Sequence, residues 1–146
     1  MVSLTTTRHE LDFHTAGSVL NDITAGLTGW LTEIGAGEGL LTLFVRHSSA
    51  CLTIQESNDR AAQSDLLAML SRLAAEGLGR QQRSDLLGDM PAHIRAMLSS
   101  LSLSIPVVAG RLALGTWQAV YLIEHRMRSD RRAVVLQFIG ATEAAR

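Results

Sequence analysis

The order in which helical and extended patterns follow one another limits the fold of this chain most. After an extended opening at about residues 3–13, apolar residues at three- and four-residue steps predict an amphipathic helix over 19–34. Extended segments at 40–47 and 51–55 come next. They lead to a second predicted helix at 60–76, whose inward face is expected to carry Leu66, Leu67, Leu70 and Leu73.

The remainder of the chain is mostly extended. A short third helix is predicted to begin within DMPAHIRAML, residues 89–98, and strands are predicted at about 103–107, 112–125 and 133–139. Helices grouped early and strands grouped late do not alternate as they do in a parallel doubly wound fold. We therefore expect an α+β fold, a single compact domain over residues 1–146 with a mainly antiparallel sheet and about three helices.

Composition narrows the classes of function. The 146 residues, 47% hydrophobic and 18% charged, can bury one real core. A net charge of −1, 4% aromatic residues and the lack of any segment with roughly 18 apolar residues argue against nucleic acid and membrane as partners. The single Cys51 excludes an internal disulfide and fits a reducing compartment. Because the opening MVSLTTTRHELDF has neither a basic start nor an apolar run, we expect an unprocessed cytoplasmic protein.

Three of the five histidines, His47, His93 and His125, fall at ends of predicted elements. Their spacing is not one of the short patterns that bring two metal ligands together, so spacing alone supports a metal site only weakly. Asp89 as N-cap and Pro91 in the first turn place His93 at about the fourth helical position, where the helix dipole disfavours imidazolium. A neutral His93 suits a metal ligand or a general base, whereas Asp89 can equally serve only as a cap.

The segment GTWQAVYLIEHR, residues 115–126, carries the densest polar pattern. Strand alternation places Trp117, Tyr121 and His125 on one face and Glu124 on the other, so His125 and Glu124 are expected to point in opposite directions. In a purely structural reading, Trp117 and Tyr121 face the core and Glu124 pairs with an arginine.

A second polar cluster, HSSACLTIQES, covers residues 47–57. Adjacent residues seldom meet as nucleophile and base, and no G-x-S-x-G motif occurs, so we do not expect a Ser–His hydrolase. The hydroxyls of Ser48 and Ser49 better suit a bound phosphate or the backbone of the bend. Cys51 is expected to be a small buried residue.

Four segments, HSSACLTIQES, DMPAHIR, GRLALGTWQ and EHR, together resemble the YjbQ-like family, often labelled secondary thiamine-phosphate synthase. The resemblance spans about residues 9–140 and rests on the order and spacing of these short motifs. It implies an α+β homotrimer with a polar pocket near a subunit interface, and histidines suspected of binding a metal such as zinc. It also implies a weak ability to supply thiamine phosphate.

Matching residues carry the family's features onto this chain. His47, His93 and His125 align with the histidines of its HTSA, PAHI and EHR segments, and further matches are Asp89, Gly115, Thr116, Trp117, Gln118, Glu124 and Arg126. Two departures stand out. The sequence Gln55-Glu56-Ser57-Asn58-Asp59 replaces the family's usual N-E-N-A-D, and Gln82 stands where a family histidine is common, which points to altered specificity or reduced activity.

The first hypothesis is a transferase, in which a thiazole nitrogen displaces pyrophosphate from a pyrimidine methyl carbon. Such a site must screen the charge of the leaving group, for which a divalent metal (zinc or magnesium) suffices without an organic cofactor. The expected catalytic residues are His47, His93, Glu56 and Asp89, and the expected metal ligands are His47, His93 and His125. Substrate contacts are expected from Ser48, Ser49, Thr116, Trp117, Gln118 and Arg126.

The second hypothesis is a non-catalytic homotrimer that binds a small phosphorylated or anionic metabolite without turning it over. The change at Gln82 favours this reading. Under both hypotheses the partner is a small phosphorylated metabolite.

Overall fold

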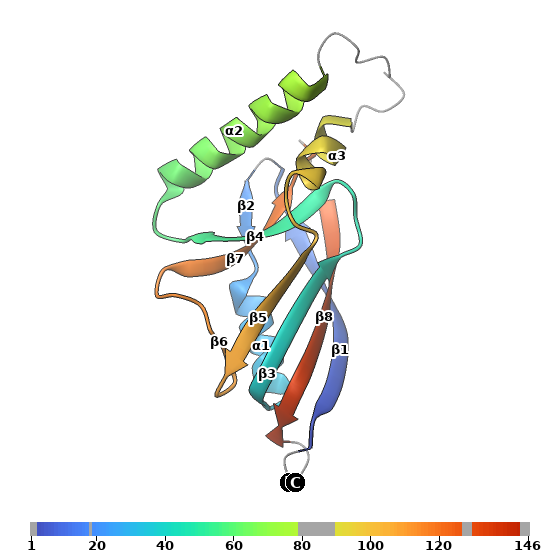
Figure 1. Cartoon of the computed structure of the whole chain (residues 1–146), viewed down its shortest axis with the longest axis vertical. Coiled ribbons are helices and arrows are strands. Elements are labelled where there is room, and N and C mark those ends of the chain that lie inside the picture. The colour runs from blue at the N-terminus through green and yellow to red at the C-terminus, as the bar shows by residue number, and fades with distance from the viewer. Residues whose placement is uncertain (1–2, 18, 79–89, 127–129, 144–146) are drawn as a thin grey trace.

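The computed structural model describes residues 3–17, 19–78, 90–126 and 130–143 (Figure 1). In chain order the elements are β1 (Thr5–Thr15), β2 (Leu20–Asp22), α1 (Thr24–Glu33), β3 (Ala36–Val45), β4 (Ala50–Glu56), α2 (Arg60–Leu78), α3 (Met90–Met97), β5 (Ser102–Val108), β6 (Arg111–Leu112), β7 (Gln118–Glu124) and β8 (Asp130–Thr142).

The strands form two antiparallel sheets. The larger has the order β1-β8-β3-β5-β6, and the smaller has the order β2-β7-β4. The expected α+β fold with a mainly antiparallel sheet and three helices is therefore confirmed. None of the helices in the described part of the chain is both long enough and apolar enough to cross a bilayer.

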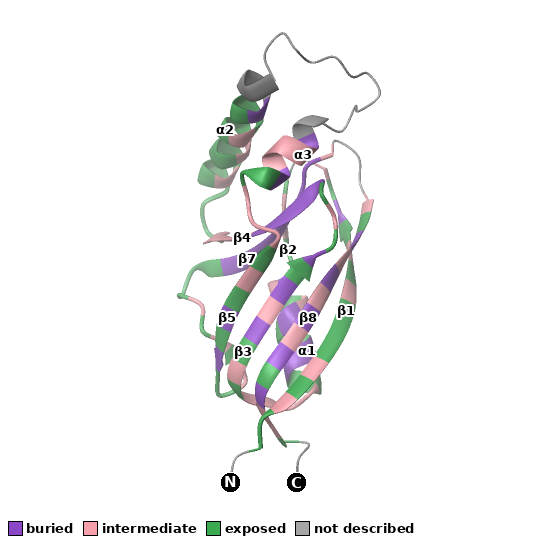
Figure 2. Cartoon of the chain, turned by 45° about the vertical axis from the view of Figure 1, so that its right-hand side comes forward, coloured by how far each residue is buried: buried purple, intermediate pink, exposed green. Residues whose placement is uncertain are grey.

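The core lies between the two sheets and α1. Leu41, Leu43 and Val45 alternate along β3 toward this core, where Leu27 and Leu31 of α1 meet them. Figure 2 shows the buried residues in purple along α1, β3, β7 and β8. Val120 and Leu122 bring the small sheet into the same cluster, so one core unites both sheets.

Two element boundaries differ from the sequence prediction. The first helix begins at Thr24 rather than near Val19, because β2 pairs with β7 and Asp22 Oδ1 then accepts a hydrogen bond from the Thr24 N–H. The predicted strand over 112–125 is divided into β6 and β7. A turn between Gly115 and Gln118 divides it and passes the chain from the large sheet to the small one.

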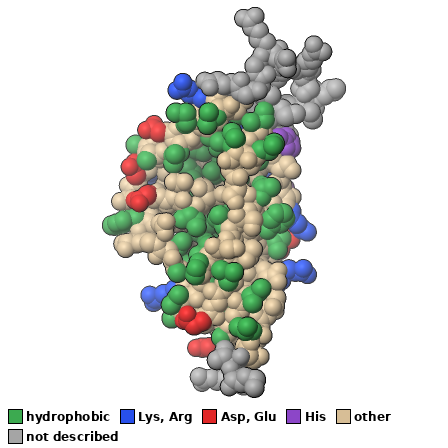
Figure 3. All heavy atoms as spheres, in the orientation of Figure 1, with side chains coloured by type: hydrophobic (Ala, Val, Ile, Leu, Met, Phe, Trp, Pro, Cys, Tyr) green, Lys and Arg blue, Asp and Glu red, His purple; other side chains and the backbone are tan. Residues whose placement is uncertain are grey.

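Helix α2 is less covered than its sequence predicts. Asp59 Oδ1 accepts a hydrogen bond from the Ala62 N–H, as expected near an N-cap. Leu66 and Leu73, both predicted to face inward, are each 49% exposed. The prediction was wrong for these two because α2 lies at the edge of the molecule, where only part of its apolar surface has a partner (Figure 1). Figure 3 shows hydrophobic side chains over much of the face that carries α2.

Candidate functional site

A buried ion pair between Glu124 and Arg132 stands at one end of the small sheet. Arg132 Nε lies 2.5 Å from Glu124 Oε2, and Arg132 Nη2 lies 2.7 Å from Oε1. Only 4% of the Arg132 side chain and 0% of the Glu124 side chain are exposed. Glu124 follows Val120 and Leu122 on the core-facing side of β7, so the pair continues the core at its end.

Neighbouring groups complete the hydrogen bonding of this carboxylate. Thr15 Oγ1 donates to Glu124 Oε2 at 3.2 Å, and the Arg126 N–H donates to Oε1 at 3.0 Å. Burial by itself would raise the pKa of Glu124, but the hydrogen bonds from Arg132 and from the Arg126 amide hold it below the ordinary value. Glu124 is therefore an anion at neutral pH, and Arg132 is its counter-ion.

Arg132 also holds His47 and Ser49. Its Nη2 donates to Ser49 Oγ at 2.9 Å, and its Nη1 lies 3.2 Å from His47 Nδ1. A guanidinium has only donors, so Nδ1 must accept, and the proton of the neutral imidazole is then on Nε2. Burial, followed by the charge of Arg132, lowers the pKa of His47. The half-buried His47 is thus a neutral ring with an Nε2–H donor.

His125 forms a separate buried contact on the other face of β7. Its Nε2 lies 3.2 Å from Cys51 Sγ. Burial and then the charge of Arg95 lower the pKa of His125 to about 4, and burial raises the pKa of Cys51 to about 11. Both groups are neutral at pH 7, so they do not form a reactive thiolate–imidazolium pair. The prediction that Glu124 and His125 point in opposite directions is confirmed.

The structure places five of the eleven predicted site residues at one end of the β4–β7 pair. Ala50 pairs with Glu124, which places His47, Ser48, Ser49, Glu124, His125 and Arg126 at one end of the β4–β7 pair. We call this group the histidine end. His93 is the fourth residue of α3, as predicted, and is half-buried; α3 is joined to the histidine end by Arg95 Nη2, which donates to the carbonyl of His125. Asp89 and Gln82 lie outside the described residues.

The other predicted residues lie at the opposite end of the same strands. Glu56 pairs with Gln118, six residue steps from the Ala50–Glu124 pair, or about 20 Å at the rise of an extended chain. Thr116 and Trp117 precede Gln118 here, and all four are exposed. We call Glu56, Thr116, Trp117 and Gln118 the tryptophan end. Within one chain, the two ends do not form one pocket.

Two residues of the tryptophan end differ from expectation. Trp117 does not face the core, because it lies in the turn before β7 and is 57% exposed. The Gln118 side chain closes that turn, since its Oε1 accepts a hydrogen bond from the Gly115 N–H at 2.8 Å. Tyr121, in contrast, is buried as expected.

The geometry gives no metal-binding group within the described residues of one chain. No three His, Cys, Asp or Glu side chains among them are arranged to hold an ion. At His47, the nitrogen facing Arg132 accepts a hydrogen bond and the other carries the proton, so neither has a lone pair for a metal. The metal-ligand roles of His47, His93 and His125 stay predictions.

Sequence reasoning missed Arg132 and Thr15. A signal for Arg132 was present, because it stands in phase with Val134, Leu136 and Phe138, all buried on one face of β8. An arginine in the register of a buried face requires a charged partner. Thr15 carries no comparable signal, since its role depends on β1 pairing with β8, where it lies opposite Asp130.

Comparisons with known proteins agree with this architecture. The family model described as "UPF0047 protein YjbQ-like" matches residues 9–141. A UPF0047 protein of Synechocystis sp. is 43% identical over 128 residues, which cover 86% of each chain. The UPF0047 protein YjbQ of Salmonella typhimurium is 34% identical over 102 residues, covering 70% of this chain and 74% of its own.

Solved structures show the same fold. A member of the yjbq/upf0047 family from Clostridium acetobutylicum superposes with a TM-score of 0.76 at 31% identity, covering 87% of this chain and 97% of its own. A YbjQ-like protein of unknown function from Sulfolobus solfataricus reaches a TM-score of 0.82 at 24% identity, covering 94% and 99%. The family model and the relatives above 30% identity together show that this chain belongs to the YjbQ-like UPF0047 family.

Proposed function

We propose that the histidine end binds a small phosphorylated metabolite, with the Nε2–H of His47 donating a hydrogen bond to a phosphate oxygen. The observation that carries the proposal is the contact between Arg132 Nη1 and His47 Nδ1 at 3.2 Å. It makes His47 a donor while His47 itself stays neutral. A preorganised donor with a fixed tautomer stabilises an anion without reorganisation when the ligand arrives.

Further donors lie beside His47. The Ser48 hydroxyl is exposed, and Arg126 follows His125 directly, with Arg126 Nη1 lying 3.6 Å from Asp130 Oδ2. Arg132 donates hydrogen bonds both to the Ser49 hydroxyl and to Glu124. In this proposal Ser48, His47 and Arg126 contact the ligand, and the Glu124–Arg132 pair positions them.

The reaction we propose for this site is thiamine-phosphate formation of the transferase type. A thiazole nitrogen attacks the methyl carbon of a pyrimidine methyl pyrophosphate, the C–N bond forms, and the C–O bond breaks with its electron pair leaving on pyrophosphate. Donors on the leaving pyrophosphate lower the barrier because negative charge grows there. His47 is the donor whose geometry supports this role.

A non-catalytic binding protein is the second candidate, and the distance between the two ends favours it. Glu56, Thr116, Trp117 and Gln118 lie about 20 Å from the histidine end along the β4–β7 pair, so one chain offers only five of the eleven predicted residues to a ligand there. A homotrimer in which these residues approach a neighbouring histidine end would restore the set. If no neighbouring subunit brings these residues close, we expect the histidine end to bind its ligand without catalysing a reaction.

Exposed apolar surface supports the proposed homotrimer. On the outer face of the large sheet, Leu40 and Ile139 are cross-strand partners and are 40% and 46% exposed, with Phe44 on the same face at 43%. On α2, Leu66, Met69 and Leu73 form an exposed stripe at helical spacing. Contiguous apolar surface of this kind marks protein interfaces.

Sedimentation velocity tests the assembly directly. We expect a trimer for the wild type and a shift to monomer for Phe44→Asp. Leu4→Asp, at an exposed leucine outside both patches, serves as the matched control and should stay trimeric. A wild-type chain that sediments as a monomer would refute the assembly.

A zinc or magnesium ion enters this proposal only with ligands from a second subunit. When bound near the phosphates, such an ion would neutralise the charge of the leaving group. The described residues of one chain do not by themselves fit a metal. Elemental analysis of untagged protein measures whether the assembled chain retains an ion.

Two measurements test the proposed function. Calorimetric titration with inorganic pyrophosphate should give saturable binding, and His47→Ala should weaken it about tenfold or more, the usual effect of losing a hydrogen bond to a charged group. His14→Gln, at an exposed histidine of β1, is the control and should not change the affinity. Product formed from the pyrimidine pyrophosphate and thiazole phosphate supports the transferase; binding without product supports the second candidate. Absence of binding contradicts both.

A further inference from the structure

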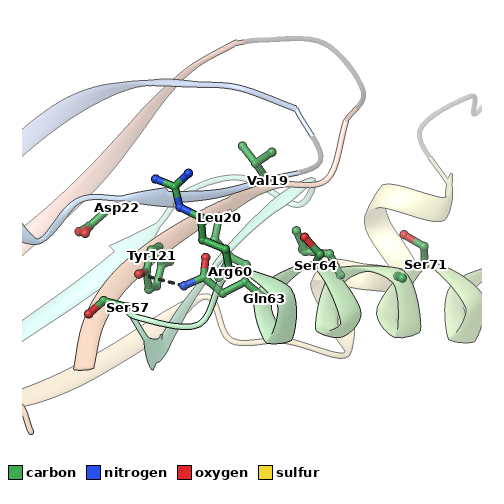
Figure 4. Close-up of a pocket in the computed structure, with 11 residues that line it drawn as sticks. Val19, Leu20, Asp22, Ser57, Arg60, Gln63, Ser64, Ser71 and Tyr121 are labelled. Carbon is green, nitrogen blue, oxygen red and sulfur yellow. Dashed lines mark hydrogen bonds between the residues drawn. The ribbon is translucent and has the colours of Figure 1, made fainter. Parts of the chain in front are cut away.

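A large cavity lies under α2, on the face of the small sheet opposite the core. It has a volume of about 660 Å³, within the range of small-molecule sites. Helix α2 forms one wall, and β2 and β7 form the other through Leu20, Asp22 and Tyr121 (Figure 4). None of the residues of the histidine end lines it, so the cavity is a separate feature.

The inner wall of this cavity holds the partly buried hydroxyl of Tyr121, whose proton is not used by any described residue. Tyr121 is 4% exposed, and its oxygen accepts a hydrogen bond from Gln63 Nε2 at 3.2 Å. Figure 4 shows the two side chains pointing toward one another, joined by this hydrogen bond. The second amide hydrogen of Gln63 goes to the Glu56 carbonyl at 2.7 Å. No acceptor for the Tyr121 hydroxyl hydrogen occurs among the described residues, so this hydroxyl can donate a hydrogen bond into the cavity.

The positively charged side chain of Arg60 lies at the same cavity. Arg60, the first residue of α2, lines it, is exposed, and makes no ion pair with any other described residue. Figure 4 shows its side chain reaching from α2 toward β2. Its guanidinium can form a two-point contact with a carboxylate or a phosphate.

The remaining lining sets the shape and charge of the ligand. Leu20 and Leu67 give apolar surface on opposite walls, which suits a flat ring. Asp22 adds a carboxylate whose Oδ1 already accepts the Thr24 N–H. A carboxylate beside the cavity disfavours a ligand of high negative charge and favours one that carries a hydrogen-bond donor.

We propose that the cavity between α2 and the small sheet is a binding site for a small aromatic anion that carries an amino or hydroxyl substituent. The ring lies between Leu20 and Leu67. The anionic group pairs with Arg60, a ligand oxygen or ring nitrogen accepts the Tyr121 hydrogen, and the substituent donates toward Asp22. This site does not depend on the function proposed for the histidine end.

The probe for the experiment is 4-aminobenzoate, titrated into the uniformly ¹⁵N-labelled full chain and followed by amide chemical shifts. We expect saturable shifts at Arg60, Gln63 and Tyr121. The uncharged analogue 4-aminobenzamide should bind at least tenfold more weakly, because it lacks the anionic group. Binding of the amide as tight as that of the acid would overturn the proposal.

Matched variants separate specific binding from loose association. Arg60→Gln should weaken 4-aminobenzoate at least tenfold, Arg60→Lys should retain most of the affinity, and Tyr121→Phe, which removes only the hydroxyl, should weaken it about threefold to tenfold. Arg72→Gln, at an exposed arginine of the same helix that does not line the cavity, is the control. His47→Ala should change pyrophosphate binding and leave 4-aminobenzoate unaffected. Unchanged affinity in Arg60→Gln, or no cavity shifts with wild type, overturns the inference.

Discussion

Arg132 and Glu124 form a two-point ion pair, with N···O distances of 2.5 and 2.7 Å, in which neither side chain has appreciable exposure. Such a pair contributes little net stability compared with a well-packed apolar pair, but removing one partner leaves the other charged and buried. In this chain the pair fixes the position of the Arg132 guanidinium, which in turn orients the side chains of His47 and Ser49.

Breaking this pair should be costly. We expect Glu124→Gln to lower the free energy of unfolding by about 3–5 kcal/mol, since Arg132 loses its counter-ion in a buried site. Urea denaturation at pH 7 measures it. The exposed pair of Arg46 and Glu10, 2.6 Å apart, offers the control, and Glu10→Gln should cost less than about 1 kcal/mol. Equal costs for the two variants would contradict the described burial.

The stability of the fold should fall as the solution is acidified from about pH 6.5 to about pH 4. In this window an unfolded His125 binds a proton, whereas the folded His125, with a pKa of about 4, does not. Protonation therefore favours the unfolded state, by about 2–3 kcal/mol at the acid end of the window. Denaturation at pH 4.5 and pH 7 measures the difference.

His125→Asn should reduce that pH dependence, because it removes the titrating group. His14→Gln, at an exposed histidine, should keep it. Glu124 and His47 also have lowered pKa values, so part of the acid loss will remain in His125→Asn. A full wild-type pH dependence in that variant would rule out His125 as a source.

Cys51 should be inert toward thiol reagents in the folded protein. It is fully buried, and burial raises its pKa to about 11, so almost no thiolate is present at pH 8. We expect labelling by a chromogenic disulfide reagent to be limited by unfolding and to become fast in concentrated guanidinium chloride. Labelling of the native chain at the unfolded rate would refute the buried Cys51–His125 contact.

The turn between β5 and β6 should accept a stabilising substitution. Ala109 has a φ of 50° and Gly110 a φ of 76°, and their flanking residues Val108 and Arg111 are paired, as in a two-residue hairpin turn. Alanine is strained in the left-handed region, which asparagine and glycine tolerate better. Ala109→Asn should raise the free energy of unfolding by about 0.5–1 kcal/mol in urea denaturation. Ala113→Gly, at an exposed position beyond the hairpin, should not stabilise.

Local patterns predicted most elements because they depend on neighbours in the sequence. The alternation along β8 and the helical spacing after Asp59 both appear in the structure. The strand predicted over 112–125 failed because two sheets share that segment. An alternating pattern indicates which residues are buried, but it does not indicate to which sheet the strand belongs.

The candidate site could be read from the sequence only in part. The pairing of Ala50 with Glu124 places His47 and His125 at the same end of the β4–β7 pair. The two rings have different partners there, Arg132 for His47 and Cys51 for His125, and their shared metal-ligand role stays a prediction. The same register separates Glu56 and Gln118 from that end, which no motif spacing shows. The sequence shows only that Arg132 alternates in step with the buried residues of β8. That its partner is Glu124 is known only from the structure.

The sequence by itself determined the α+β class, the helix at Arg60 and the family, because each depends on local periodicity or motif order. Only the tertiary structure decided which polar residues meet. The pairing of β4 with β7 and of β1 with β8 brings Glu124, Arg132 and Thr15 together and fixes the tautomer of His47. The Thr15–Glu124 and His47–Arg132 contacts join residues more than eighty positions apart. Such contacts depend on strand register, and strand register is a property of the folded sheets.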